Sequence, residues 1–126
     1  MPRDMFLQVK GEGLNVGCVL TWGPCYDFQR KFFRAGIDNL SEPFTLLKYD
    51  VEVSGLGSQA LWHVFLLNLN DQTSPGSDGS KDRGWPTWTV PLMRWAKAQG
   101  AYTGYAHSAS GLHIDPLNAS KRLLSR

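Results

Sequence analysis

The stretch LLKYDVEVS, residues 46–54, decides the fold class of this chain. Apolar or aromatic side chains occupy every second position from Leu47 to Val53, and charged side chains fill the positions between them. A period of two residues is typical of a β-strand with one buried and one polar face. Gly55 and Gly57 follow at once and end the strand. The stretch therefore predicts a sheet, around which the other elements are arranged.

Other segments of the chain predict further elements of this sheet. Apolar runs indicate strands, polar and glycine-rich runs indicate turns, and a helical period indicates helices. The expected elements are strands at 16–22, 61–69 and 101–106, helices at 26–35 and 91–99, the latter capped by Gly100, and a long polar loop at 70–87. The order strand, loop, helix, strand is typical of a βαβ unit, so we expect a partly parallel α/β sheet.

The composition is that of one globular domain spanning residues 1–126. Hydrophobic residues make up 42% and charged residues 19% of the chain, and the formal net charge is +2. Such a small charge predicts no nucleic-acid partner, and no apolar run approaches the roughly 20 residues that span a membrane. The start of the chain lacks the apolar core of a signal peptide, and Cys18 and Cys25 form no Cys-x-x-Cys pair. A cytoplasmic protein with reduced thiols is therefore expected.

Three residues on successive predicted strands form a candidate metal site. Glu52, His63 and His107 supply one carboxylate and two imidazoles, a suitable ligand set for zinc, manganese or iron. Asp50 shares the polar face of its strand with Glu52 and is at most a carboxylate that orients a ligand. Each residue also has a structural interpretation, because the carboxylates can face solvent at a sheet edge and His63 can be a hydrogen-bonded core residue.

Two further features suggest other kinds of binding. Residues 55–60, GLGSQA, match the pattern G-x-G-x-x-A of dinucleotide-binding loops. Asp50 and Glu52 argue against this match, because the strand before such a loop is normally buried on both faces. Trp85 and Trp88 either form an exposed aromatic surface for a partner or anchor the long loop onto the core.

Four segments together resemble the middle of the polymerase-and-histidinol-phosphatase (PHP) domain metallohydrolases. These segments are YDVEVSG (49–55), WHVFLL (62–67), GWPTWT with LMRWAKAQG (84–100) and GYAHS (104–108). The similarity is to the carbaryl-hydrolase-like branch and covers roughly residues 14–112. It implies a distorted β/α barrel with mainly parallel strands and metal ions at the carboxyl ends of the strands.

The resemblance also implies roles for the three candidate ligands. Glu52 corresponds to the metal-bridging glutamate, His63 to the histidine of the next strand, and His107 to the histidine of the family's Ala-His-Ser motif. The metal ions would activate a water for attack on a phosphoester or a related bond.

The chain departs from the family in ways that change the expected function. The opening His-x-His and closing Asp-x-His motifs are missing, and related barrels need about 200 residues or more. We therefore expect a partial PHP-like barrel, incomplete at both ends. It would be a fragment of a metal-dependent hydrolase, weakly active or inactive alone, with a small-molecule substrate if active.

The missing strands lead to two further expectations. An open sheet exposes its edges, which predicts a homo-oligomer or a partner chain that supplies the missing strands. One alternative function is a non-catalytic interaction module built from a truncated barrel. A weaker alternative is a nucleotide-binding α/β domain.

Overall fold

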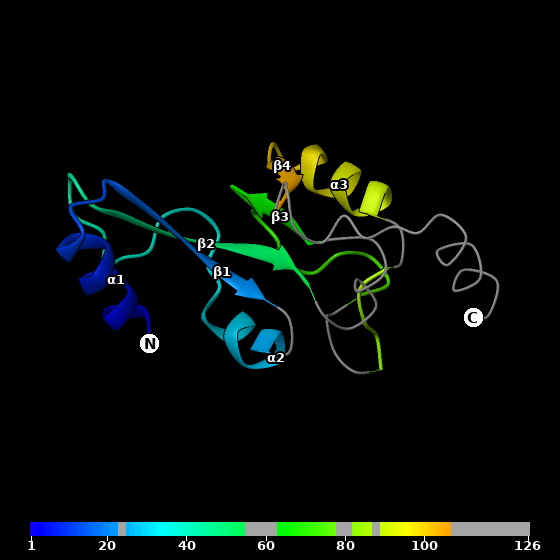
Figure 1. Ribbon diagram of the computed structural model, residues 1–126, viewed down its shortest axis with the longest axis horizontal. Helices are drawn as coiled ribbons and strands as arrows, with labels where there is room; N and C mark the ends of the chain where they lie inside the picture. The colour runs from blue at the N-terminus through cyan, green and yellow to red at the C-terminus, as the bar shows by residue number, and fades with distance from the viewer. Residues whose placement is uncertain (23–24, 55–62, 78–81, 87–88, 107–126) are drawn as a thin grey trace.

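The computed structural model describes residues 1–22, 25–54, 63–77, 82–86 and 89–106 (Figure 1). The elements, in chain order, are α1 (Pro2–Gly11), β1 (Val16–Trp22), α2 (Tyr26–Gln29), the 3₁₀ helix η2 (Arg30–Phe32), β2 (Leu46–Val53), β3 (Val64–Leu67), α3 (Thr89–Ala98) and β4 (Tyr102–Tyr105). Over the part of the chain just given, no helix has the length and apolar character needed to cross a bilayer.

The four strands form one open sheet in the order β1-β2-β3-β4. The fold is α/β, as the sequence predicts, and β1 and β2 are parallel, with α2 and η2 between them in the chain. The pairs β2–β3 and β3–β4 are antiparallel. The expectation of mainly parallel strands is therefore wrong for the described sheet, which is mixed and is not closed into a barrel.

The parallel βαβ unit expected for the second half of the chain is also wrong, and the reason lies in the path of the chain after β3. The end of α3 is held beside the end of β3, because the Gln99 side-chain oxygen accepts hydrogen bonds from the N–H groups of Asn70 (3.0 Å) and Asp71 (2.8 Å). β4 therefore starts where β3 ends and must run antiparallel to it. Gly100, with φ of +82°, makes the tight turn between α3 and β4.

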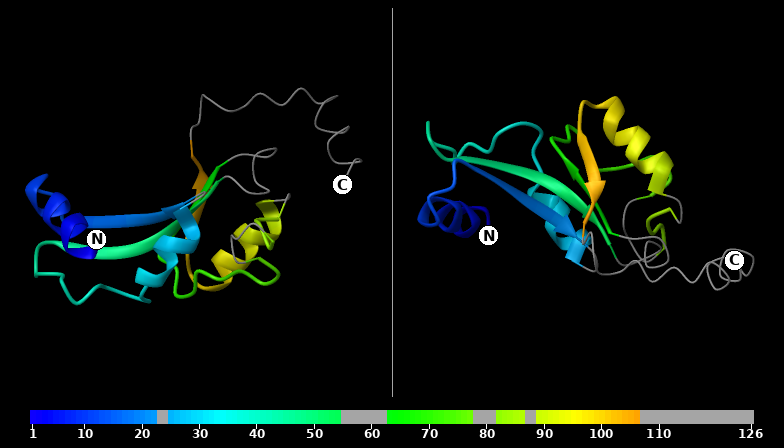
Figure 2. Two further views of the ribbon diagram at one scale, coloured as in Figure 1. Left: turned by 90° about the horizontal axis from the view of Figure 1, so that it is seen from below. Right: turned by 45° about the horizontal axis from the view of Figure 1, so that its top comes forward.

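The alternating pattern of β2 places its apolar side chains on the face covered by the helices. Leu47, Tyr49, Val51 and Val53 are all 3% exposed or less. α2 and α3 lie on the same side of the sheet (Figure 2). Two core clusters fill the space: one joins β2 and β3 to Tyr26, Trp85 and α3, and the other joins β2 to Phe6 and Val9 of α1.

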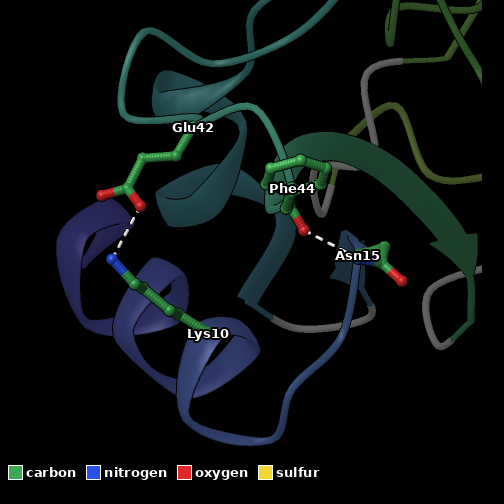
Figure 3. A network of polar contacts seen from close by, with 4 residues as sticks. All are labelled: Lys10, Asn15, Glu42 and Phe44. Carbon is green, nitrogen blue, oxygen red and sulfur yellow. Dashed lines mark hydrogen bonds and ion pairs between the residues drawn. The ribbon is translucent and has the colours of Figure 1, made fainter.

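Polar contacts fix α1 and the start of β1 to the turn that precedes β2 (Figure 3). Lys10 of α1 forms an ion pair with Glu42 at 2.7 Å, and the Asn15 side chain donates a hydrogen bond to the Phe44 carbonyl at 2.9 Å. The helix also lies close to the strand, because a Cβ at Gly17 would be only 2.2 Å from a methyl carbon of Val9. α1 is therefore part of the folded unit, although the sequence analysis predicts no helix there.

Candidate functional site

The structure brings together two of the three predicted metal ligands. Glu52 lies near the carboxyl end of β2 and is in register with Phe65 of β3, so that His63, two residues before Phe65, points to the same face. The Glu52 Oε1 and His63 Nδ1 atoms are 3.3 Å apart. The Glu52 and His63 side chains are 21% and 40% exposed, respectively, although the His63 Nδ1 atom itself is buried.

The third predicted ligand, His107, lies outside the described residues. The residue before it, Ala106, donates its backbone N–H to the His63 carbonyl at 3.0 Å. The chain therefore arrives beside His63 just before His107. Over the described parts of the chain taken alone, no group of three or more His, Cys, Asp or Glu side chains is arranged to hold a metal ion.

An aromatic ring borders the Glu52–His63 pair. A Cβ placed on Gly104 would be 2.3 Å from the Phe65 Cζ, so the Phe65 ring lies directly over Gly104 of the neighbouring strand. The absence of a side chain at Gly104 provides the space for this ring. The pair thus combines a carboxylate and an imidazole with an apolar neighbour on the side of β4.

Asp50 has a different role from Glu52, although both lie on one face of β2. It is fully buried, and its Oδ1 accepts a hydrogen bond from the Leu69 N–H at 3.1 Å, where the chain leaves β3. The preceding residue, Asn68, has a φ of +67°, a backbone conformation that residues other than glycine adopt rarely. Asp50 therefore stabilises the turn at the end of β3.

Loss of hydration controls the protonation of the buried Asp50 and acts in part on its neighbour Cys18, although Cys18 is an exposed residue. Burial raises the pKa of the Asp50 carboxyl, and the hydrogen bonds from Leu69 and Cys18 lower it only in part. Burial and the hydrogen bond to Asp50 raise the pKa of the Cys18 thiol to about 11. The Cys18 thiol therefore favours its protonated form at neutral pH, which makes it a weak nucleophile.

Trp85 lies inside the core and not on the surface. It is 3% exposed, and its ring packs edge-on against Tyr26 with the ring centroids 4.9 Å apart. A partner cannot reach its indole there, so Trp85 anchors the long loop. Trp88 and the glycine-rich residues 55–60 lie outside the described residues.

Gln72 fixes the same loop to the sheet, a role that no sequence pattern predicts. Its side-chain nitrogen donates to the Thr21 hydroxyl at 2.9 Å and to the Asp50 carbonyl at 3.1 Å. The Tyr26 hydroxyl donates a hydrogen bond to the backbone carbonyl of Gln72 at 2.8 Å. A glutamine in a polar loop carries no sequence signal for such a position, because its partners come from distant parts of the chain.

Comparisons with protein-family models, with curated proteins and with solved structures find no match. The resemblance to PHP metallohydrolases therefore stays a hypothesis, which depends on Glu52, His63 and His107.

Proposed function

We propose that this chain binds a divalent transition metal ion, zinc, manganese or iron, through Glu52, His63 and His107, and that it is part of a metal-dependent hydrolase. The separation between Glu52 and His63 carries this proposal. Two donor atoms about 2.0–2.1 Å from one tetrahedral metal ion lie about 3.3–3.4 Å from each other. The distance between Glu52 Oε1 and His63 Nδ1 is 3.3 Å.

The surroundings of the pair support the same proposal. Both side chains are partly exposed, and a metal ion would have to reach the buried His63 Nδ1 atom from the Glu52 side. The hydrogen bond from Ala106 to His63 brings the preceding neighbour of His107 to the site. A bound metal ion would lower the pKa of a coordinated water and so favour hydrolysis of a phosphoester or a related bond. Glu52 and His63 would fix its position, and the Phe65 ring would limit access from the side of β4.

The hydrolase would be weakly active or inactive as this chain alone. Three ligands hold one ion, whereas the PHP resemblance implies several ions and two further histidine motifs that this chain lacks. In a partial PHP-like barrel, the missing strands and ligands would come from a partner chain. Metal binding is therefore the property to test first.

The experiment is metal titration of the metal-free protein with Zn²⁺, Mn²⁺ and Co²⁺, followed by calorimetry and by the visible spectrum of the cobalt form. We expect one ion per chain, and a loss of affinity of about tenfold or more for each of Glu52→Gln, His63→Gln and His107→Gln. Glu12→Gln, an exposed change in the described part of the chain, is the control and should bind as the unaltered protein does. A folded protein that binds no ion, or a control that loses as much affinity as the three variants, contradicts the proposal.

A further inference from the structure

β1 is an edge strand, and no described strand lies on its outer side. The Asn15 carbonyl accepts a hydrogen bond from the Leu46 N–H at 2.8 Å, so the backbone groups of Asn15 point toward β2. Backbone groups of successive residues alternate between the two sides of a strand. Those of Val16, Cys18 and Leu20 therefore point outward and are available to a further strand.

The sequence of β1 lacks the features that protect an edge strand. Its seven residues, VGCVLTW, include no charged residue and no proline, and Val16 is 54% exposed. Edge strands of natural proteins usually carry lysine, proline or a bulge that prevents pairing with another chain. An unprotected edge of this length indicates that a strand pairs with it.

A cavity of about 260 Å³ lies against this edge. Its lining includes Met1, which precedes α1, Met5 of α1, Phe32 of η2 and Tyr49 of β2. Four consecutive β1 residues, 18–21, also line it, so the cavity follows the backbone of the strand as well as one face. Methionine and phenylalanine side chains make such a cavity suitable for an aliphatic side chain.

A second cavity of about 280 Å³ shares Pro2 and Phe32 with the first and carries positive charge. Lys31 and Arg34 line it. Asp38 also lines it, but its two carboxylate oxygens already accept hydrogen bonds, one from the Leu40 N–H and one from the Tyr49 hydroxyl, both at 2.8 Å. The cavity therefore favours an acidic side chain.

We propose that the β1 groove, formed by the outer edge of β1 and these two cavities, binds an extended segment of a partner protein as an additional strand. An aliphatic side chain of the segment fills the methionine-lined cavity, and an acidic side chain lies beside Lys31 and Arg34. Backbone hydrogen bonds to β1 provide affinity, and the two cavities provide specificity. This surface gives the interaction-module alternative a defined location, and it does not depend on metal binding.

A single extended segment suits the groove better than a second copy of this chain. Helices α1 and α2 lie beside the two ends of β1 (Figure 1). A second copy paired through its own β1 would bring its own α1 and η2, with the same basic residues, to the same side of the joined sheet. Repulsion between the two sets of Lys31 and Arg34 opposes that arrangement, whereas an acidic segment is attracted.

The test uses fluorescein-labelled peptides of the sequence Thr-Val-Thr-Leu-Thr-Val-Glu-Glu, with binding measured by fluorescence anisotropy. Two further peptides carry backbone N-methyl groups, one at odd and one at even positions. Only one set of N–H groups can face β1, so one methylated peptide should lose affinity by about tenfold or more and the other should not. Hydrogen exchange at Val16, Cys18 and Leu20 should slow when the unmodified peptide binds.

Charge reversal tests the second cavity. The double variant Lys31→Glu, Arg34→Glu should weaken the acidic peptide by about tenfold and leave a peptide ending in Gln-Gln almost unchanged. Lys97→Glu, an exposed change on α3, is the matched control. Equal affinity for the two methylated peptides, or no binding of the acidic peptide at millimolar concentration, overturns the proposal. Protein that dimerises in sedimentation experiments, with the β1 amides protected without peptide, also overturns it and assigns the edge to a second copy.

Discussion

Replacing Asp50 with asparagine will remove a pH-dependent cost to stability. The Asp50 carboxyl is fully buried, and burial raises its pKa above the value of about 3.9 that aspartate has in an unfolded chain. A group with a raised pKa binds its proton more tightly in the folded state. Its contribution to stability is therefore complete below about pH 3.9 and is lost as the pH rises through the folded pKa.

The structure gives the sign and the scale of the effect. Asparagine retains an oxygen that accepts the Leu69 hydrogen bond but has no charge to bury. Between about pH 4 and the folded pKa, the unaltered protein should lose stability relative to Asp50→Asn. The difference in unfolding free energy should grow by up to about 1.4 kcal/mol per pH unit. Asp50→Ala removes the acceptor as well, so it should be about 1–3 kcal/mol less stable than Asp50→Asn at pH 7.

The assay is urea unfolding followed by tryptophan fluorescence from pH 4 to pH 8. Glu12→Gln, a change at an exposed carboxylate, is the control and should follow the unaltered protein at every pH. The reasoning fails if the difference between Asp50→Asn and the unaltered protein is independent of pH, or if it shrinks as the pH rises. It also fails if Asp50→Ala is as stable as Asp50→Asn, because the Leu69 N–H would then need no acceptor.

Three further predictions concern single contacts of the fold. In a Cys25→Ser variant, the rate at which iodoacetamide alkylates Cys18 should rise up to about pH 11, because burial and Asp50 hold the thiol protonated; a rate that levels off below pH 9 would contradict this. Gly104→Ala should reduce the unfolding free energy by about 1–3 kcal/mol in urea denaturation, because the new methyl group collides with the Phe65 ring. Adding Phe65→Val should recover part of that loss, and no recovery would place the collision elsewhere. Gln72→Ala should cost about 1–3 kcal/mol in the same assay, since it removes the hydrogen bonds that Gln72 donates to the buried Thr21 hydroxyl and to the Asp50 carbonyl. Thr73→Ala, an exposed change, should cost little.

Elements with a strong local pattern could be predicted from the sequence. β1 has the predicted bounds, and β2 ends one residue before the predicted end, since glycine or proline follows each apolar run in the sequence and such residues disfavour a strand. The cap at Gly100 was predicted correctly because glycine readily adopts the positive φ that ends a helix. α1 was missed because its buried face consists mainly of Phe6 and Val9, and the contact with Gly17 that makes them a core face comes from another part of the chain.

The candidate site could be predicted only in part. The alternation along β2 puts Glu52 on the polar face, but its approach to His63 depends on the register of β2 against β3, which no local pattern fixes. The same alternation placed Asp50 on that face, as a carboxylate that at most orients a ligand. The difference arises because β3 ends at Leu67 and the following turn needs a hydrogen-bond acceptor at Asp50. Where β3 ends depends on contacts between distant parts of the chain, which a local sequence pattern does not show.

β1 has the amino-acid composition of an interior strand but lies at the edge of the sheet. An uninterrupted run without charges is typical of a strand inside a sheet, whereas edge strands usually carry charges that prevent pairing, yet β1 has a neighbour only at β2 among the described strands. Helices already cover one face of the sheet and the cavity lies open beside the edge, so burial by the described core does not account for the lack of charges. A strand added at the β1 groove would make charges that protect the edge unnecessary. The sequence of β1 and the strand order therefore support the same inference independently, since one is a property of composition and the other of topology.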